Sequence, residues 1–509
     1  MWATLSPASA TFSAIAVTVL LSGGSMAAEG PEDVSRPSGP ENRLVLVQEG
    51  VSKAPIVVFE DAPRFTRRAA DELAEYMEKV SGARPKVIEG KPDPVPEHAI
   101  WVGHQPVMNE LFPDVDFDFQ HPEEILIAAD DGHLAIAGRD RWDPDSLVAK
   151  IGRKEVHGVQ MEYGTANAVY TFVQKHLGVR WLWPGELGED VPERETIAFT
   201  PFEYRYRSQI RSRRGIFDYS RLGKGGGASL KWTQRQRLAL DSLERPGSHG
   251  FNEWWDRFHE AHPEYFALQP DGTRSGFPGP GRHKMCKSNP GLWEQWLSTN
   301  VQEEVAKNSQ RRIFCAAAND SWASGYCICE RCRAWDHPQG DRRIFRWQGL
   351  AQEYVAVSDR QVIFANMLGR MLEKQYPDKD YFVNILAYGH SRPPPVAAVP
   401  EDNVIVACVG NFVINPEAVD RASETGETHK EQFAAWGRKA PNLFWRPNIT
   451  RRMAPFPNIP LTATINNLRF VAENNCMGIK IDKLWEDWAT RGPMYYIIAQ
   501  MAWNPWQDG

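Results

Sequence analysis

The chain has 509 residues, of which 42% are hydrophobic and 24% are charged, a composition typical of globular proteins and unlike that of disordered, collagen-like or coiled-coil chains. Its 58 Lys and Arg and 65 Asp and Glu give a formal net charge of −7, and they form no basic block that could follow a phosphate backbone, so we expect no nucleic-acid partner. The 19 Trp suit stacking on sugar rings, although any single one is more often a core residue.

The first 28 residues predict a signal peptide. An apolar run at 14–21 is followed by small residues and by Met26-Ala27-Ala28, the pattern of an h-region with a cleavage site. The run is too short to span a bilayer, and no later stretch approaches the roughly 18 apolar residues of a membrane helix. We therefore expect a periplasmic or secreted protein without a membrane span, in which residues 29–42 form a Pro/Gly/Ser-rich linker.

Residues 43–202 predict a small α+β domain. Thr66 is a plausible N-cap for a helix that Gly82 ends, and Gly178 follows a second helix. Asp130-Asp131-Gly132 marks the turn of a hairpin. We expect the two helices to pack on one mixed sheet, which is the simplest arrangement that buries their apolar faces. The predicted strands are 44–47, 56–59, 100–103, 125–127 and 134–136, and the predicted helices are 66–81 and 166–177.

From residue 203 to residue 509, short apolar strands alternate with longer helical patterns. Repeated β-then-α order predicts a parallel sheet, and about 300 residues of it fit a (β/α)₈ TIM-type barrel. An open doubly wound sheet is the alternative, but no Gly-rich phosphate fingerprint follows an early strand. Polar or aromatic residues follow several strands, where a barrel places its chemistry. The predicted strands are 313–316, 382–388, 404–408, 443–445 and 478–482, and the predicted helices are 293–305, 362–372 and 465–473.

Several phrases of the sequence resemble known families. AADELAEYMEKVSG (69–82), GTANAVY (164–170) and LGVRWLWPG (177–185) resemble the accessory domain before the barrel of β-hexosaminidases and xylan α-glucuronidases. HPEYF (262–266), CKSNP (286–290), Asn319-Asp320 before CICERCR (327–333), and Tyr495-Tyr496 before Trp503-Asn504-Pro505 are similar to a bacterial family of uncharacterised exported glycosidases, named only as a domain of unknown function. The resemblance spans roughly residues 45–509 and implies the fold and a carbohydrate-active role. Such proteins usually continue into a helical C-terminal region, so a C-terminally truncated chain is one interpretation of its end.

Glycoside cleavage generally needs two carboxyl groups that flank the scissile bond. Asp320 is the first candidate, because it follows an apolar strand beside Asn319 and Trp322, where desolvation would raise the pKa of a carboxyl group and the Trp would offer a stacking wall. Xylan α-glucuronidases place their acid in a similar Ala-Asn-Ser-Glu phrase, one position later, where this chain has Ser321. The alternative is that Asp320 caps the following turn.

The second carboxylate is expected in the acidic cluster after the last strand. Glu486 is the first choice for base or nucleophile and Asp482 the next, with Trp485 beside them. One of these acids could instead cap a helix N-terminus. A substrate-assisted mechanism, as in the β-hexosaminidases, would need an adjacent carboxylate pair, and Asp320 is preceded by Asn. We therefore predict an exported glycoside hydrolase acting on a polysaccharide or oligosaccharide, with α-glucuronidase-like activity as one option. The rival is a non-catalytic carbohydrate-binding protein on the same scaffold.

Further residues are candidates for binding the sugar. Arg213, flanked by Arg211 and Arg214, would suit an acidic sugar such as a uronate, or would pair with barrel carboxylates. His249 would bond a hydroxyl, or is a structural histidine. The remaining candidates supply stacking and polar contacts: Asn319, Trp322, Tyr388, His390, Trp445, Arg446 and Trp485.

The cysteines form one conspicuous pattern, Cys327-x-Cys329-x-x-Cys332, with Cys286 as a possible fourth member. Four thiolates could bind zinc, although this is not the usual paired spacing. In an exported protein we favour one or two structural disulfides, and redox catalysis is the least favoured use. Either a zinc ion or the disulfides would hold the loop beside Asp320 in place. No His-x-x-x-His or Glu-x-x-His spacing occurs on a predicted helix, so we expect no catalytic metal and no cofactor.

Overall fold

The N-terminal domain of the computed structural model is built on one mixed sheet. Its order is β1(Glu32–Ser35)–β14(Phe202–Arg207)–β7(Glu124–Ala129)–β8(His133–Gly138)–β6(Ala99–Val102)–β4(Ile56–Val58)–β5(Val87–Glu89). The strands from β8 to β5 run parallel, and the others pair antiparallel. The structure describes residues 32–35, 43–151, 154–217, 226–276, 279, 281–320, 325–347, 350–409, 429–447, 461–481 and 488–507.

Two helices, α1 (Arg64–Ser81) and α3 (Gly164–Lys175), pack on this sheet as predicted. Helix α1 ends at Gly82, whose φ of 77° is the left-handed conformation that glycine adopts without strain. Thr66 does not cap α1; its hydroxyl donates to Asp140 at 3.1 Å instead. In the predicted hairpin turn, the carboxylate of Asp130 accepts the N–H of Gly132 at 2.8 Å.

The other elements of this domain surround that core. They are α2 (Met108–Leu111), the long hairpin β9 (Asp140–Ile151) and β10 (Lys154–Tyr163), the group β2 (Leu44–Gln48), β3 (Val51–Ser52) and β13 (Ile197–Phe199), the pair β11 (Arg180–Trp181) and β12 (Glu189–Asp190), and the turn η1 (Glu186–Gly188). Since β14 belongs to the first sheet, this domain extends beyond residue 202, where the sequence suggested its boundary.

The second domain contains a parallel sheet in chain order, β15(Ile313–Cys315)–β18(Phe382–Ala387)–β19(Val404–Cys408)–β20(Asn442–Trp445)–β21(Cys476–Ile479). Two irregular segments connect the edges of this sheet. Ser212 bridges Gly478 of β21 in parallel, the N–H of Leu243 donates to Arg211, and the N–H of Gly250 donates to Ala317. These are the five strands that the sequence predicts, and among the described residues the parallel sheet has five strands where a (β/α)₈ barrel has eight. The two segments are not regular strands, because Arg, Ser, Gly and Pro dominate 211–215 and 245–248.

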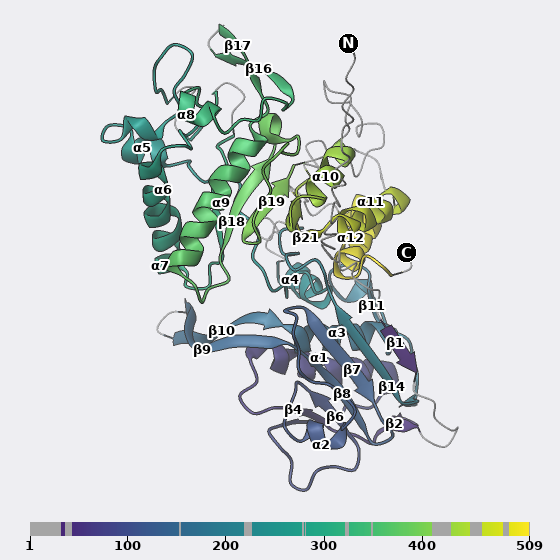
Figure 1. The fold of residues 1–509 in the computed structure, drawn as a ribbon. Coiled ribbons are helices and arrows are strands. Elements are labelled where there is room, and N and C mark those ends of the chain that lie inside the picture. The colour runs from purple at the N-terminus through teal and green to yellow at the C-terminus, as the bar shows by residue number, and fades with distance from the viewer. Residues whose placement is uncertain are drawn as a thin grey trace, which may run out of the picture.

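Helices cover the outside of this sheet. Helix α9 (Ser358–Gln375) lies along β18, and α11 (Leu461–Glu473) and α12 (Trp488–Trp503) lie side by side at the C-terminal end (Figure 1). The helical elements 290–307 follow one another directly as α6 (Pro290–Trp296), η4 (Leu297–Gln302) and α7 (Glu303–Lys307). The remaining elements are α4 (Gly226–Arg235), α5 (Trp254–Phe258), η3 (Pro263–Tyr265), α8 (Glu330–Arg333), the hairpin β16 (Arg342–Trp347) and β17 (Leu350–Val355), η5 (Gly389–Ser391) and α10 (His429–Gly437).

The two domains share a buried interface. In α4, the Arg235 guanidinium pairs with Glu72 of α1 at 3.0 Å and with Glu189 at 2.6 Å. Close by, the indole of Trp232 donates to the carbonyl of Trp181 at 2.8 Å. One continuous cluster of buried apolar side chains extends through both domains.

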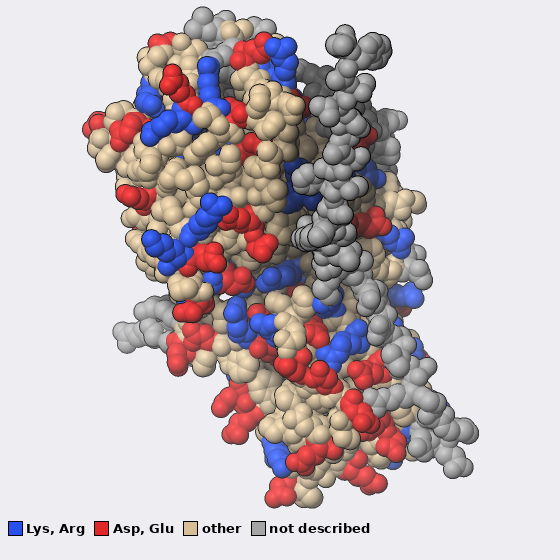
Figure 2. Space-filling view, in the orientation of Figure 1, with Lys and Arg blue, Asp and Glu red and all other residues tan. Residues whose placement is uncertain are grey.

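The surface carries charges of both signs. On the described part of the face shown in Figure 2, Lys and Arg are interspersed with Asp and Glu, and no continuous basic area forms. Among the helices that the structure describes, none has both the length and the apolar character needed to cross a membrane.

Candidate functional site

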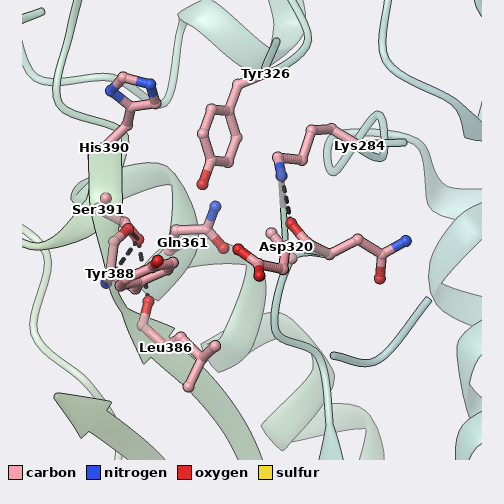
Figure 3. A pocket seen from close by; sticks show the side chains of 11 residues that line it. Lys284, Asp320, Tyr326, Gln361, Leu386, Tyr388, His390 and Ser391 are labelled. Atoms are coloured by element: carbon pink, nitrogen blue, oxygen red, sulfur yellow. Dashed lines mark hydrogen bonds between the residues drawn. The ribbon is translucent and has the colours of Figure 1, made fainter. Parts of the chain in front are cut away.

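A pocket opens where two neighbouring parallel strands end. Asp320 follows β15, and the stretch 388–391 follows β18. Both strands therefore present their carboxyl ends to one site, as predicted for a barrel mouth. The pocket is lined by Lys284, Ala318, Asn319, Asp320, Tyr326, Gln361, Leu386, Tyr388, Gly389, His390 and Ser391, most of them labelled in Figure 3.

Two polar rings of the lining are uncharged at neutral pH. Burial raises the pKa of Tyr326 to about 12, so its hydroxyl stays protonated. Burial, together with the positive charges of Arg343 and Lys284, lowers the pKa of His390 to about 4, so its imidazole is neutral. Neutral donors and acceptors of this kind match the hydroxyl groups of a sugar.

The pocket also holds one buried donor that the protein does not satisfy. The side chain of Gln361 is 2% exposed, and its Oε1 accepts a hydrogen bond from the ammonium of Lys287. Its Nε2 has no hydrogen-bond partner among the described residues. Figure 3 shows this amide lying between Asp320 and the hydroxyl of Tyr326. A buried unpaired N–H that faces a pocket indicates a place for an acceptor atom of a ligand.

The charged groups of the described lining are Asp320 and Lys284. The Lys284 ammonium donates to the carbonyl of Asn319, directly before Asp320. Burial lowers the pKa of Lys284 to about 8, although the nearby Asp320 carboxylate opposes this shift. Asp320 itself is exposed, so the desolvated environment that we expected for its carboxyl group is not what the structure shows. The pocket thus places a carboxylate and a cation side by side.

Asn319 has a structural role at this site. Its side chain is 3% exposed, accepts from the N–H of Phe251 at 3.2 Å and donates to the carbonyl of Phe251 at 3.0 Å. Both functions of the amide are therefore occupied by backbone. Asn319 fixes the turn that carries Asp320, instead of offering its amide to a ligand.

His249 and Arg446 lie near the pocket without lining it. The Nδ1 of His249 is 2.9 Å from the carbonyl of Ala318. Burial lowers the pKa of His249, with Arg446 contributing in the same direction and Asp320 opposing it. Arg446 is 8% exposed and follows β20. The charges of Arg446 and Asp320 thus both act on His249, in opposite directions.

The prediction that Arg213 binds an acidic sugar is wrong. Its guanidinium is fully buried and pairs with Glu123 of the N-terminal domain at 2.8 Å. The neighbouring Arg214 pairs with Asp241 at 2.9 Å, and Arg211 lies 3.9 Å from Asp380. These arginines hold carboxylates of the protein, which is the alternative that the sequence left open.

The prediction that Trp445 stacks on a sugar is also wrong. Trp445 ends β20, where it pairs with Cys408 of β19, and it is 1% exposed. A ring that is buried in the core has no face available to a ligand. Four other predicted residues lie outside the described part of the chain: Trp322, Asp482, Trp485 and Glu486.

The four cysteines of the conspicuous pattern come together beside the pocket. The Sγ atoms of Cys286, Cys327, Cys329 and Cys332 all lie within 4.8 Å of one another. No disulfide joins them, since all seven cysteines are free; the expected disulfides are therefore absent. The cluster lies one residue from Tyr326 and two from Lys284, both of which line the pocket.

Sequence reasoning did not identify Lys284, Tyr326, Gln361 or Ser391. The predicted site residues are mainly ones that directly follow strands. Lys284 and Tyr326 instead come from long loops, and Gln361 comes from the first turn of α9. One signal was present, because Lys284 and Tyr326 directly neighbour the cysteine motif.

Comparisons with known proteins bear on the second domain and on the fold. The model of a family described as Domain of unknown function (DUF4838) matches residues 183–509. No curated protein matches the chain. Among solved structures, N-acetyl-beta-hexosaminidase of Streptomyces plicatus is similar at 11% identity and a TM-score of 0.41, covering 93% of this chain and 90% of that chain. The chitobiase of Flavobacterium johnsoniae is similar at 9% identity and a TM-score of 0.43, covering 93% and 68%.

Proposed function

The chain belongs to the DUF4838 family, and we propose that it is a glycoside hydrolase that holds a sugar in the Asp320 pocket. The pocket lies at the carboxyl ends of parallel strands, the usual position of the active site in β/α barrels. Its walls carry neutral polar groups around one carboxylate. This combination suits a polyhydroxyl ligand that undergoes acid–base chemistry.

The observation that carries the proposal is an unsatisfied buried donor, the Nε2 of Gln361, in the same pocket as the Asp320 carboxylate. The unpaired Nε2 of Gln361 offers a donor to a ligand oxygen, and its amide lies between the Asp320 carboxylate and the Tyr326 hydroxyl (Figure 3). An oxygen bound there, a ring hydroxyl or the glycosidic oxygen, would share the pocket with a carboxyl group that can serve as acid or base.

Asp320 supplies one of two carboxyl groups in this proposal. Glu486 is the first choice for the other, as base or nucleophile, and Asp482 the next. A separation of roughly 5 Å between the two carboxyl groups would give retention of anomeric configuration, and one of about 6.5–9.5 Å would give inversion. A separation well beyond this range would rule out the assigned pair.

A uronic-acid substrate, as in the xylan α-glucuronidases, is the finer proposal. Because the arginines at 211–214 are occupied, the recognition of a sugar carboxylate falls to Lys284, the cation of the described lining. At neutral pH this ammonium is charged, since the pKa of Lys284 is about 8.

The test is a turnover screen with the purified full-length protein. Aryl glycosides and uronic-acid oligosaccharides are incubated with the protein, and released sugars are identified by mass spectrometry. The proposal expects hydrolysis of at least one member, with uronic-acid substrates preferred. If no member of the panel is hydrolysed, the proposal is contradicted.

One observation favours the rival, a carbohydrate-binding protein without activity. Among the described residues that line the pocket, Asp320 is the single carboxylate. Isothermal titration against the same oligosaccharides separates the two functions, because saturable binding without product would establish the rival.

We also propose that residues 1–28 direct export. Fractionation of cells that express the full chain should place the mature protein outside the cytoplasm, with its N-terminus near residue 29. A full-length chain retained in the cytoplasm would contradict this.

A further inference from the structure

Four cysteine thiols meet at one point beside the pocket, although they come from separate parts of the chain. Cys286 lies in a segment that pairs with the loop at Phe266. Cys327 and Cys329 lie in the loop after β15, and Cys332 lies in the short helix α8. Three of the four are buried, and Cys329 is half-buried. This arrangement is independent of the proposed sugar site.

The spacing of the sulfur atoms matches a tetrahedral ion. Zinc held by thiolates at about 2.3 Å in tetrahedral geometry requires sulfur atoms about 3.8 Å apart. The Sγ of Cys286 lies 3.7 Å from that of Cys329 and 3.9 Å from that of Cys332. A disulfide would need about 2.05 Å. Two disulfides would also require only that each thiol lie close to one partner, whereas here all four thiols lie close to one another.

The surroundings of the thiols suit a negatively charged tetrathiolate. The N–H of Leu268 donates to the Sγ of Cys327 at 3.3 Å, and the hydroxyl of Ser288 lies 3.1 Å from the Sγ of Cys332. The guanidinium of Arg274 hydrogen-bonds Cys286. Such outer contacts orient metal ligands and offset their charge.

The apolar cluster that immediately surrounds the thiols is small. The small core here consists of Ala267 and the cysteines 286, 327 and 332, with Leu268 and Cys329 packed against it. A cluster this small adds little free energy at the point where the loop after β15 meets the Cys286 segment, whereas a structural metal would supply it directly.

We propose that Cys286, Cys327, Cys329 and Cys332 bind one structural zinc ion. The ion fastens the segment that carries Lys284 to the loop that carries Tyr326, so it fixes two walls of the pocket. It takes no part in the chemistry, because all four of its positions are filled by protein ligands.

The test is metal analysis of the full-length protein, purified without chelators. We expect about one zinc per chain by inductively coupled plasma mass spectrometry, and X-ray absorption at the zinc edge showing four sulfur ligands at about 2.3 Å. Cys332→Ser should lose its zinc to a chromogenic chelator under conditions in which the wild type keeps it. Cys315→Ser, which changes a cysteine outside the cluster, should retain zinc as the wild type does.

The wild-type measurement decides even if Cys332→Ser fails to fold. Metal-free protein would overturn the proposal. Thiol titration of the denatured chain would then show what the cysteines form: three free thiols would indicate two disulfides, and seven free thiols would indicate that all the cysteines are reduced. Iron in place of zinc would overturn the assigned metal. Zinc binding without glycoside turnover would leave this inference standing while the proposed function failed.

Discussion

Lys284 gives the pocket a charge that responds to pH near the physiological range. Its pKa of about 8 means that the ammonium is present below that pH and is lost as the pH rises through it. We therefore expect the binding of a uronic-acid ligand to weaken above about pH 8. Lys284→Met should bind weakly at all pH values and lack this loss of affinity at alkaline pH. Titration calorimetry between about pH 6 and pH 10, roughly 2 units on either side of the pKa, would show this.

The control for this prediction is Lys307→Met, which removes an exposed lysine at the end of α7 that does not line the pocket. It should keep the wild-type pH profile. An alkaline limb that persists in Lys284→Met would assign the titration to another group.

Tyr326 presents a protonated hydroxyl to the same pocket. Removing it in Tyr326→Phe should raise the Kd for the sugar by about 2- to 12-fold, since a neutral hydrogen bond contributes about 0.5–1.5 kcal/mol. The thermal midpoint should change little. Tyr376→Phe, at the end of α9, is the matched control, and equal affinities in the two variants would remove Tyr326 from the binding site.

Sequence reasoning found the residues that strand ends position. Asn319, Asp320, Tyr388 and His390 line the pocket because each follows a strand recognisable as an apolar run. The sequence-based predictions for Arg213 and Trp445 are wrong. Nothing in the sequence distinguishes a side chain that faces a barrel mouth from one that contacts a buried partner.

At the scale of elements, the turn after β15 depends on Asn319. Asn319→Leu would leave the N–H and the carbonyl of Phe251 unpaired in a buried position. An unsatisfied buried group costs about 1–3 kcal/mol, so we expect the free energy of unfolding to fall by a similar amount or more. Urea denaturation measures this, with Asn308→Leu in an exposed turn as the control. Unchanged stability of Asn319→Leu would contradict the structural role assigned to Asn319.

The predictable elements share one property. Strands β15 and β18 to β21 are continuous apolar runs, as strands buried on both faces must be. The hairpins β9–β10 and β16–β17 were not predicted, because their strands are rich in charged residues and lack regular alternation. The segment at Arg211–Gly215 joins the sheet through backbone bonds that its polar sequence does not reveal.

At the scale of the molecule, buried ion pairs unite the two domains. Arg213→Met would leave Glu123 buried without its cation, which typically costs about 3–5 kcal/mol. We expect one cooperative unfolding transition with the free energy of unfolding lowered by that amount, and an unchanged KM for any substrate that the screen identifies. A raised KM of Arg213→Met with unchanged stability would instead indicate that Arg213 binds the substrate.

The central claim is that Asp320 performs chemistry on a bound sugar, and Asp320→Asn tests it most directly. With a substrate identified by the screen, kcat and Kd are measured for the wild type, for Asp320→Asn and for Asp378→Asn, an exposed aspartate in the turn after α9. We expect Asp320→Asn to lower kcat by about 10²- to 10⁴-fold, the usual contribution of a general acid or base, with Kd within a few-fold of the wild type and the control unaffected. Hydrolysis by Asp320→Asn at the wild-type rate would contradict the claim.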